Sequence, residues 1–114
     1  MTPRLKTELW VQAFLRRCAV AGKNGAVLQR GHSDAGALLV VVNHLDGGHS
    51  LLGPAPGPAY DDEGNRRFAQ LTDVQLEWPD VAAKIARARS FDEDLWVIEV
   101  EDRDGLAGLQ PIID

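Results

Sequence analysis

Arg17 is a charged residue at a position where a buried guanidinium group would need an acidic partner. On a helical wheel for residues 8–21 it falls near the middle of the apolar face, between Trp10 and Phe14. A guanidinium group there must reach solvent or pair with a carboxylate, because an unpaired buried charge is costly. Glu99, on a predicted core strand, is a candidate partner. The pattern therefore indicates a structural ion pair or, alternatively, a pocket for an anion at a helix–sheet junction.

Three residue types that occur in hydrolytic sites stand together in the loop His32-Ser33-Asp34. The members of a catalytic triad normally come from separate parts of a fold, so immediate neighbours rarely meet as one. Asp34 precedes Ala35 and Gly36, a context that favours an Asx turn. We therefore keep Asp34 as a candidate binding residue and predict no catalytic residue.

Potential metal ligands occur in two places, and neither has the spacing of a known site. His44 and His49 flank an Asp46-Gly47 turn signal, and a two-residue turn would place the imidazoles opposite each other. Two histidines are too few for a structural zinc site, so a solvated pair is the simpler interpretation. The acidic run at residues 61–63 lacks the alternating ligands of an EF-hand. We predict no metal and no cofactor, since the chain also lacks Walker, GxGxxG, HExxH and CxxC motifs.

The composition is typical of an ordinary globular domain. The chain has 114 residues, 45% of them hydrophobic and 25% charged. Its longest apolar run, residues 37–42, is far shorter than the roughly 20 residues of a membrane span, and no signal peptide is visible. Cys18 is the only cysteine, so no internal disulfide can form, which favours a cytoplasmic location. A nucleophilic role for Cys18 would also need a base, for which no residue pattern argues.

The net charge of −5 is unevenly distributed. Residues 1–30 hold six basic side chains, among them Arg16 and Arg17, and one acidic side chain, whereas residues 31–114 hold six basic and sixteen acidic ones. This asymmetry indicates a basic binding surface or, more simply, a basic helix packed beside acidic neighbours. The acidic total argues against nucleic-acid binding.

Hydrophobic periodicity predicts seven elements. They are a helix over 8–21 with Thr7 as its N-cap, strands at 26–30, 37–45, 49–53 and 66–71, a helix from Pro79 to residue 89, and a strand at 94–101. We expect an α+β fold of order α-β-β-β-β-α-β, with a mostly antiparallel sheet of about five strands and both helices on one face. The Pro/Gly-rich connection at 54–65 is of a length that is often functional or mobile.

The predicted elements form one α+β domain over residues 1–102. Residues 103–114 are expected to be a flexible or docked C-terminal tail. The tail carries four apolar residues, Leu106, Leu109, Ile112 and Ile113.

Several short segments together resemble a bacterial family of unknown function. They are Arg4–Trp10 with Arg16-Arg17, Arg30-Gly31, Asp34–Ala37, Leu52–Pro56, Arg67-Phe68 and Phe91–Glu99. The family is domain of unknown function 1491, and the resemblance covers about residues 4–102. It implies a small stand-alone bacterial protein and supplies no activity, cofactor or catalytic residue.

These observations favour a non-catalytic binding or adaptor protein that acts through an unidentified partner protein. The alternative is a small-molecule-binding protein, or a small hydrolase- or transferase-like enzyme, with an anion pocket centred on Arg17. The candidate binding residues are Arg17, Asp34, Glu99 and Arg16. No membrane association is expected, and a homo-oligomer stays open.

Overall fold

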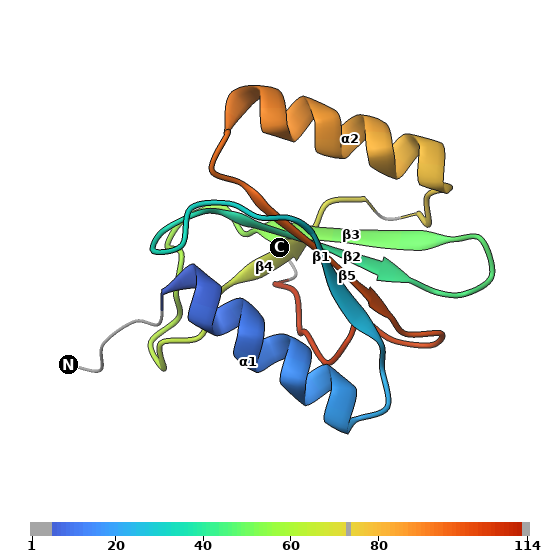
Figure 1. Cartoon of the computed structure of the whole chain (residues 1–114), viewed down its shortest axis with the longest axis horizontal. Coiled ribbons are helices and arrows are strands. Elements are labelled where there is room, and N and C mark those ends of the chain that lie inside the picture. Colours follow the sequence, from blue (N-terminus) through green and yellow to red (C-terminus); the bar gives the residue numbers. More distant parts are fainter. Residues whose placement is uncertain (1–5, 73, 113–114) are drawn as a thin grey trace.

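The computed structural model describes residues 6–72 and 74–112, and within them a five-stranded sheet carries a helix on each side (Figure 1). The elements are α1 (Thr7–Val20), β1 (Gly25–Gln29), β2 (Leu38–Asn43), β3 (His49–Pro54), β4 (Phe68–Gln70), α2 (Trp78–Phe91) and β5 (Trp96–Glu101). The predicted order α-β-β-β-β-α-β is confirmed. Neither helix has the length and apolarity needed to cross a membrane, and no other helix occurs in these residues.

The sheet is mixed but mostly antiparallel, as expected. Its strand order is β1-β5-β2-β3-β4, so the last strand in the sequence lies between the first two. β5 is parallel to β2, with Val40 beside Ile98, and the other three pairings are antiparallel. The five apolar residues of β2 are all buried, which confirms the prediction of a strand covered on both faces.

The two helices cover opposite faces of the sheet, so the expectation that both lie on one face is wrong (Figure 1). α1 packs on the face that contains Val40 and Ile98, whereas α2 packs on the face that contains Val41 and Val97. The physical reason is the apolar run in β2 and β5. Successive strand residues point to opposite faces, so both faces must be covered.

α1 buries a different stripe from the one predicted. Its buried residues are Thr7, Val11, Phe14 and Cys18, with Trp10 and Leu15 partly buried. Leu9 and Val20, which a helical wheel groups with Trp10 and Phe14 on the predicted apolar face, are 50% and 85% exposed. Thr7 is the first helical residue rather than the N-cap, which is Lys6. Because the buried stripe is rotated, Arg17 is exposed instead of buried.

The β2–β3 turn is one residue longer than predicted, which separates the two histidines. Asn43 pairs with His49, and the His44 amide donates to the Gly48 carbonyl oxygen at 3.0 Å. A shift of one residue sends a side chain to the other face, so His44 and His49 do not face each other. Both are also buried, at 4% and 6% exposure, which excludes the solvated pair. The longer turn is possible because Leu45 adopts a left-handed conformation, with φ of 64°.

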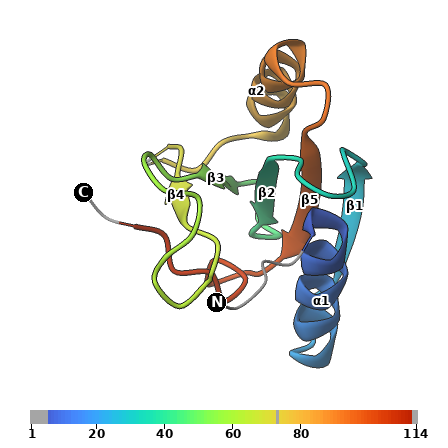
Figure 2. The same ribbon diagram turned by 90° about the vertical axis from the view of Figure 1, so that its left-hand side faces the viewer.

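The C-terminal segment as far as residue 112 is docked on the α1 face of the sheet. Ala107 is buried, and Leu106 and Leu109 pack against the core beneath α1. The Ile112 amide donates to the Phe68 carbonyl oxygen at 2.8 Å. In Figure 2 this segment runs from the end of β5 across to β4. Ile113 and Arg4 lie outside the described residues.

Candidate anion-binding site

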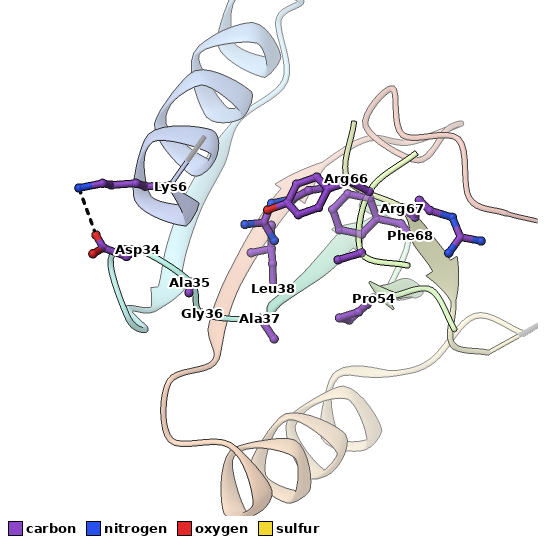
Figure 3. A pocket seen from close by; sticks show the side chains of 12 residues that line it. Lys6, Asp34, Ala35, Gly36, Ala37, Leu38, Pro54, Arg66, Arg67 and Phe68 are labelled. Carbon is purple, nitrogen blue, oxygen red and sulfur yellow. Dashed lines mark ion pairs between the residues drawn. The ribbon is translucent and has the colours of Figure 1, made fainter. Parts of the chain in front are cut away.

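A cavity of about 470 Å³ opens between the start of α1 and one end of the sheet (Figure 3). Its walls are formed by the segment that enters β2, the end of β3, the 54–67 connection and the start of β4. The lining residues are Lys6, Asp34, Ala35, Gly36, Ala37, Leu38, Pro54, Ala59, Tyr60, Arg66, Arg67 and Phe68. Most of this lining is apolar, and the charged groups come from three separate segments.

Arg66 places a half-buried positive charge on this cavity. Its guanidinium carbon lies 5.8 Å from the ring centroid of Trp10 and 5.6 Å from that of Tyr60. Its Nη2 donates to the Thr7 hydroxyl at 2.7 Å, and its buried Nε has no hydrogen-bond partner. None of the ion pairs among residues 6–72 and 74–112 includes Arg66. Aromatic faces and one hydroxyl therefore stabilise this charge, and no carboxylate of the described residues forms an ion pair with it.

Thr7 connects Arg66 to the loop before β2. It is fully buried, and its hydroxyl donates to the Gly36 carbonyl oxygen at 2.9 Å while accepting from Arg66. The same loop satisfies the first amides of α1, because Glu8 donates to the Ser33 carbonyl oxygen at 2.9 Å. The helix start, this loop and Arg66 thus form one hydrogen-bonded unit.

The long Pro/Gly-rich connection forms the opposite wall and is held by Arg67. The Nη1 of Arg67 donates to the carbonyl oxygens of Pro56 and Pro58 at 2.9 and 2.6 Å. Its backbone amide donates to the Ala59 carbonyl oxygen at 3.0 Å. In Figure 3 the Arg67 side chain extends away from Arg66. Arg67 therefore shapes the wall and leaves Arg66 as the cation at the centre.

Asp34, a binding residue predicted from the sequence, lies at the rim of this cavity. Its carboxylate is 3.6 Å from the Lys6 ammonium group, and both side chains are more than half exposed. An exposed pair of this kind contributes little free energy, so Lys6 can turn toward a bound anion at small cost.

Arg17, Asp34 and Glu99 are not brought together by the fold. Arg17 is exposed beside the Phe14 ring, with 5.8 Å between the guanidinium carbon and the ring centroid. Glu99 pairs with Val41 and so lies on the α2 face, across the sheet from α1. Arg16 is exposed and lines neither this cavity nor either of two smaller cavities lined by Arg17. The proposed Arg17–Glu99 ion pair therefore does not form.

The sequence reasoning missed Arg66. Its hydrogen-bond partner Thr7 lies 59 positions away in the chain, and no local pattern connects the two. The available signal was an arginine pair following a Pro/Gly-rich connection of unusual length.

A second polar group links His44 to Ser50. His44 Nε2 lies 2.8 Å from the Ser50 hydroxyl, and Nδ1 lies 2.7 Å from the Asp102 carbonyl oxygen. The spacing resembles a serine–histidine dyad. Both side chains are 4% exposed, and neither lines the cavities described here, so this group joins the β2–β3 hairpin to the end of β5. In the described residues, no group of three or more histidine, cysteine, aspartate or glutamate side chains could hold a metal ion.

Cys18 is a residue of α1 whose side chain is buried in the core. Desolvation raises the pKa of its thiol above the ordinary value of 9.0, although the positive charges of Arg17 and Lys23 act in the opposite direction. The thiol form is therefore favoured, and a buried thiol without an adjacent base is consistent with packing.

Comparison with known proteins identifies the family. Residues 5–110 match the family described as "Protein of unknown function (DUF1491)". The chain is also similar to the solution structure of a protein from A. tumefaciens, with 40% identity, a TM-score of 0.81, and coverage of 98% of this chain and 97% of that one. No curated protein matches the chain.

Two structures of DUF1491 family proteins from Caulobacter crescentus CB15 are similar as well. The crystal structure has 33% identity and a TM-score of 0.78, and covers 98% of this chain and 100% of that one. The NMR structure has 34% identity and a TM-score of 0.76, and covers 99% and 100%. The match extends past residue 102, so the docked segment is included in the shared fold. The chain therefore belongs to the DUF1491 family, as the sequence resemblance implied.

Proposed function

We propose that this protein is a non-catalytic binding protein whose cavity receives the carboxylate or phosphate group of an organic molecule with an apolar body. Arg66 carries the proposal, because its guanidinium group lines the cavity and forms no ion pair with an acidic residue in the described part of the chain. The Thr7 hydroxyl accepts from one of the five N–H donors of Arg66. A guanidinium group fits carboxylate and phosphate oxygens in a fork-like geometry, which makes arginine suited to this task.

The rest of the lining supports the apolar part of the ligand. Leu38 and Phe68 are buried core residues whose side chains border the cavity, and Pro54 lies beside them. Ligand sites are typically apolar cavities of roughly 300–1,000 Å³ that contain a few placed polar groups, and this cavity is within that range. Lys6 at the rim supplies a second positive charge.

The acidic group has two conceivable sources with the same chemistry. It is either a free organic acid or phosphate, or the terminal carboxylate of a partner protein, which corresponds to the adaptor role expected from the sequence. A cytoplasmic location is part of this proposal, because the buried Cys18 has no disulfide partner.

The test is a titration of the full chain, followed by backbone amide NMR and calorimetry. The probes are organic monocarboxylates, organic phosphates, and short peptides with either a free or an amidated C-terminus. Binding should shift the amide signals of residues 34–38 and 66–68, and Arg66→Gln should weaken it at least tenfold, equivalent to about 1.4 kcal/mol. Arg89→Gln is the matched control, because Arg89 is an exposed residue of α2 on the far face.

The arms of this titration separate the two sources. Preference for a free-ended peptide over its amidated form indicates a protein partner, whereas binding of the small acids alone indicates a metabolite. The proposal is wrong if no carboxylate or phosphate binds, or if Arg66→Gln and Arg89→Gln bind as well as the natural chain. Amide spectra of both variants establish that they are folded.

A further inference from the structure

We infer that the ligand is an extended dicarboxylate, whose second acidic group lies beside Arg17 in a smaller cavity. This inference rests on the proposed function, because it assigns the first carboxylate to Arg66. The smaller cavity has a volume of about 260 Å³. It is lined by Trp10, Arg17, Asp61, Asn65, Arg66, Phe68, Gly108, Leu109 and Gln110.

The two cavities are neighbours that share a wall. Arg66 and Phe68 line both of them. The guanidinium group of Arg66 is thus bordered by a cavity on each side, and the Phe68 ring supplies an apolar surface common to both. A ligand with an acidic group at each end and an apolar chain between them matches this order of polar and apolar surfaces.

A stacked aromatic pair separates the two arginines. The rings of Trp10 and Phe14 lie 4.9 Å apart at an interplanar angle of 15°. Arg66 lies at the Trp10 ring and Arg17 at the Phe14 ring, each 5.8 Å from the ring centroid. Positions 10, 14 and 17 share one side of α1, because residues three and four apart are neighbours on a helix. The rigid aromatic pair therefore holds the two cationic groups at separate ends of one surface.

Arg17 has no ion-pair partner among the described residues, whereas three other basic residues of the first 30 each have one. Lys6 pairs with Asp34, Lys23 with Asp102 at 3.8 Å, and Arg30 with Glu8. No such pair includes Arg17 in the described part of the chain. Of the adjacent pair Arg16 and Arg17, only Arg17 lines the second cavity.

The negative charge of Asp61 disfavours a second carboxylate in this cavity, and the size of this repulsion can be measured. One of the Asp61 oxygens accepts the backbone amides of Glu63 and Asn65, both at 2.9 Å. Its negative charge nevertheless lies on the second cavity. Asp61→Asn removes that charge and retains an oxygen that can accept both amides, so the loop geometry is preserved.

The experiment compares straight-chain acids that carry one or two terminal carboxylates, matched in length over a series. We expect one range of lengths in which the dicarboxylate binds about tenfold more tightly than the matched monocarboxylate. Arg17→Gln should remove this advantage, because it weakens dicarboxylate binding about tenfold more than monocarboxylate binding. Asp61→Asn should increase the advantage. Arg16→Gln is the matched control, because it makes the same charge change at the adjacent exposed residue outside both cavities.

Each outcome decides between the inference and the function on which it rests. Equal affinities for the two acids at every length overturn the dicarboxylate assignment, as does an Arg17→Gln effect no larger than that of Arg16→Gln. Monocarboxylate binding that depends on Arg66 then leaves the proposed function intact. If neither acid binds the natural chain in a way that Arg66→Gln weakens, the proposed function and this inference are both overturned.

Discussion

Replacing Thr7 by valine tests the hydrogen-bonded unit that holds Arg66 at the cavity. Valine has nearly the shape of threonine and a similar helix propensity, so the substitution removes the hydroxyl and little else. Thr7 is fully buried, and its hydroxyl connects the Gly36 carbonyl oxygen at 2.9 Å with Arg66 Nη2 at 2.7 Å. Both hydrogen bonds are lost in the variant.

The two losses differ in size because the two partners differ in exposure. Gly36 is buried, and no other donor to its carbonyl oxygen is found in the described residues, so stranding that oxygen costs about 1–3 kcal/mol. Arg66 is half-buried, so water replaces part of its lost bond, and about 0.5–1.5 kcal/mol is lost there. The added methyl group offsets about 1 kcal/mol. The free energy of unfolding should therefore fall by about 2 kcal/mol, the middle of a range of about 0.5–3.5 kcal/mol, and Tm by about 8 °C.

The assay is urea unfolding followed by tryptophan fluorescence, to which the buried Trp96 contributes. Thr72→Val is the matched control, because the Thr72 hydroxyl donates only to the nearby Val74 carbonyl oxygen, at 2.9 Å, in an exposed turn. That variant should lose less than about 0.5 kcal/mol. Thr7→Ser keeps the hydroxyl and should retain most of the stability that Thr7→Val loses. A loss in Thr7→Val no larger than in Thr72→Val would refute the assignment of Thr7 as the connecting group.

Four further predictions concern Cys18, Gly36 and His44. Burial raises the pKa of the Cys18 thiol above 9.0 in the folded state, so with rising pH the thiol ionises in the unfolded chain before it does in the folded protein. The free energy of unfolding should therefore decline as pH rises above about 9. Urea unfolding of Cys18→Ala should show less of this decline. Gly36→Ala should lose about 1–3 kcal/mol in the same assay, because a Cβ there overlaps a backbone carbonyl oxygen, whereas an unchanged midpoint would contradict that packing. Neutral His44 should carry its proton on Nδ1, because a carbonyl oxygen can only accept, and ¹⁵N shifts of the imidazole would contradict this if they showed the Nε2 tautomer. His44→Phe should lose about 2 kcal/mol or more, measured by thermal unfolding, because it strands the Ser50 hydroxyl and a carbonyl oxygen.

The order and type of the elements were predictable because they depend on local patterns. The apolar run at 37–42 indicated a strand covered on both faces, and the alternation at 94–101 indicated another. The Pro/Gly-rich connection was recognised as unusual, and it forms a wall of the candidate site. Each of these features lies within a dozen or so neighbouring residues, so the sequence carries the information directly.

Register and helix orientation could not be predicted, because small angular or positional errors change which side chains are buried. One extra residue in the turn moves His44 and His49 to opposite faces, and a modest rotation of α1 exposes Arg17. The competing arrangements differ by the packing of side chains that are distant in sequence, and no local pattern expresses that packing.

By itself, then, the sequence determined the elements, their order, the family and the basic character of the first helix. Only the tertiary structure decided which arginines face a cavity. Arg66 becomes a candidate ligand-binding group because the fold brings it to Thr7, 59 positions away, and places the rings of Trp10 and Tyr60 against it. The absence of an ion pair to Arg66 among the described residues is likewise a property of packing, since the acidic residues 61–63 are close in sequence but none of them pairs with it.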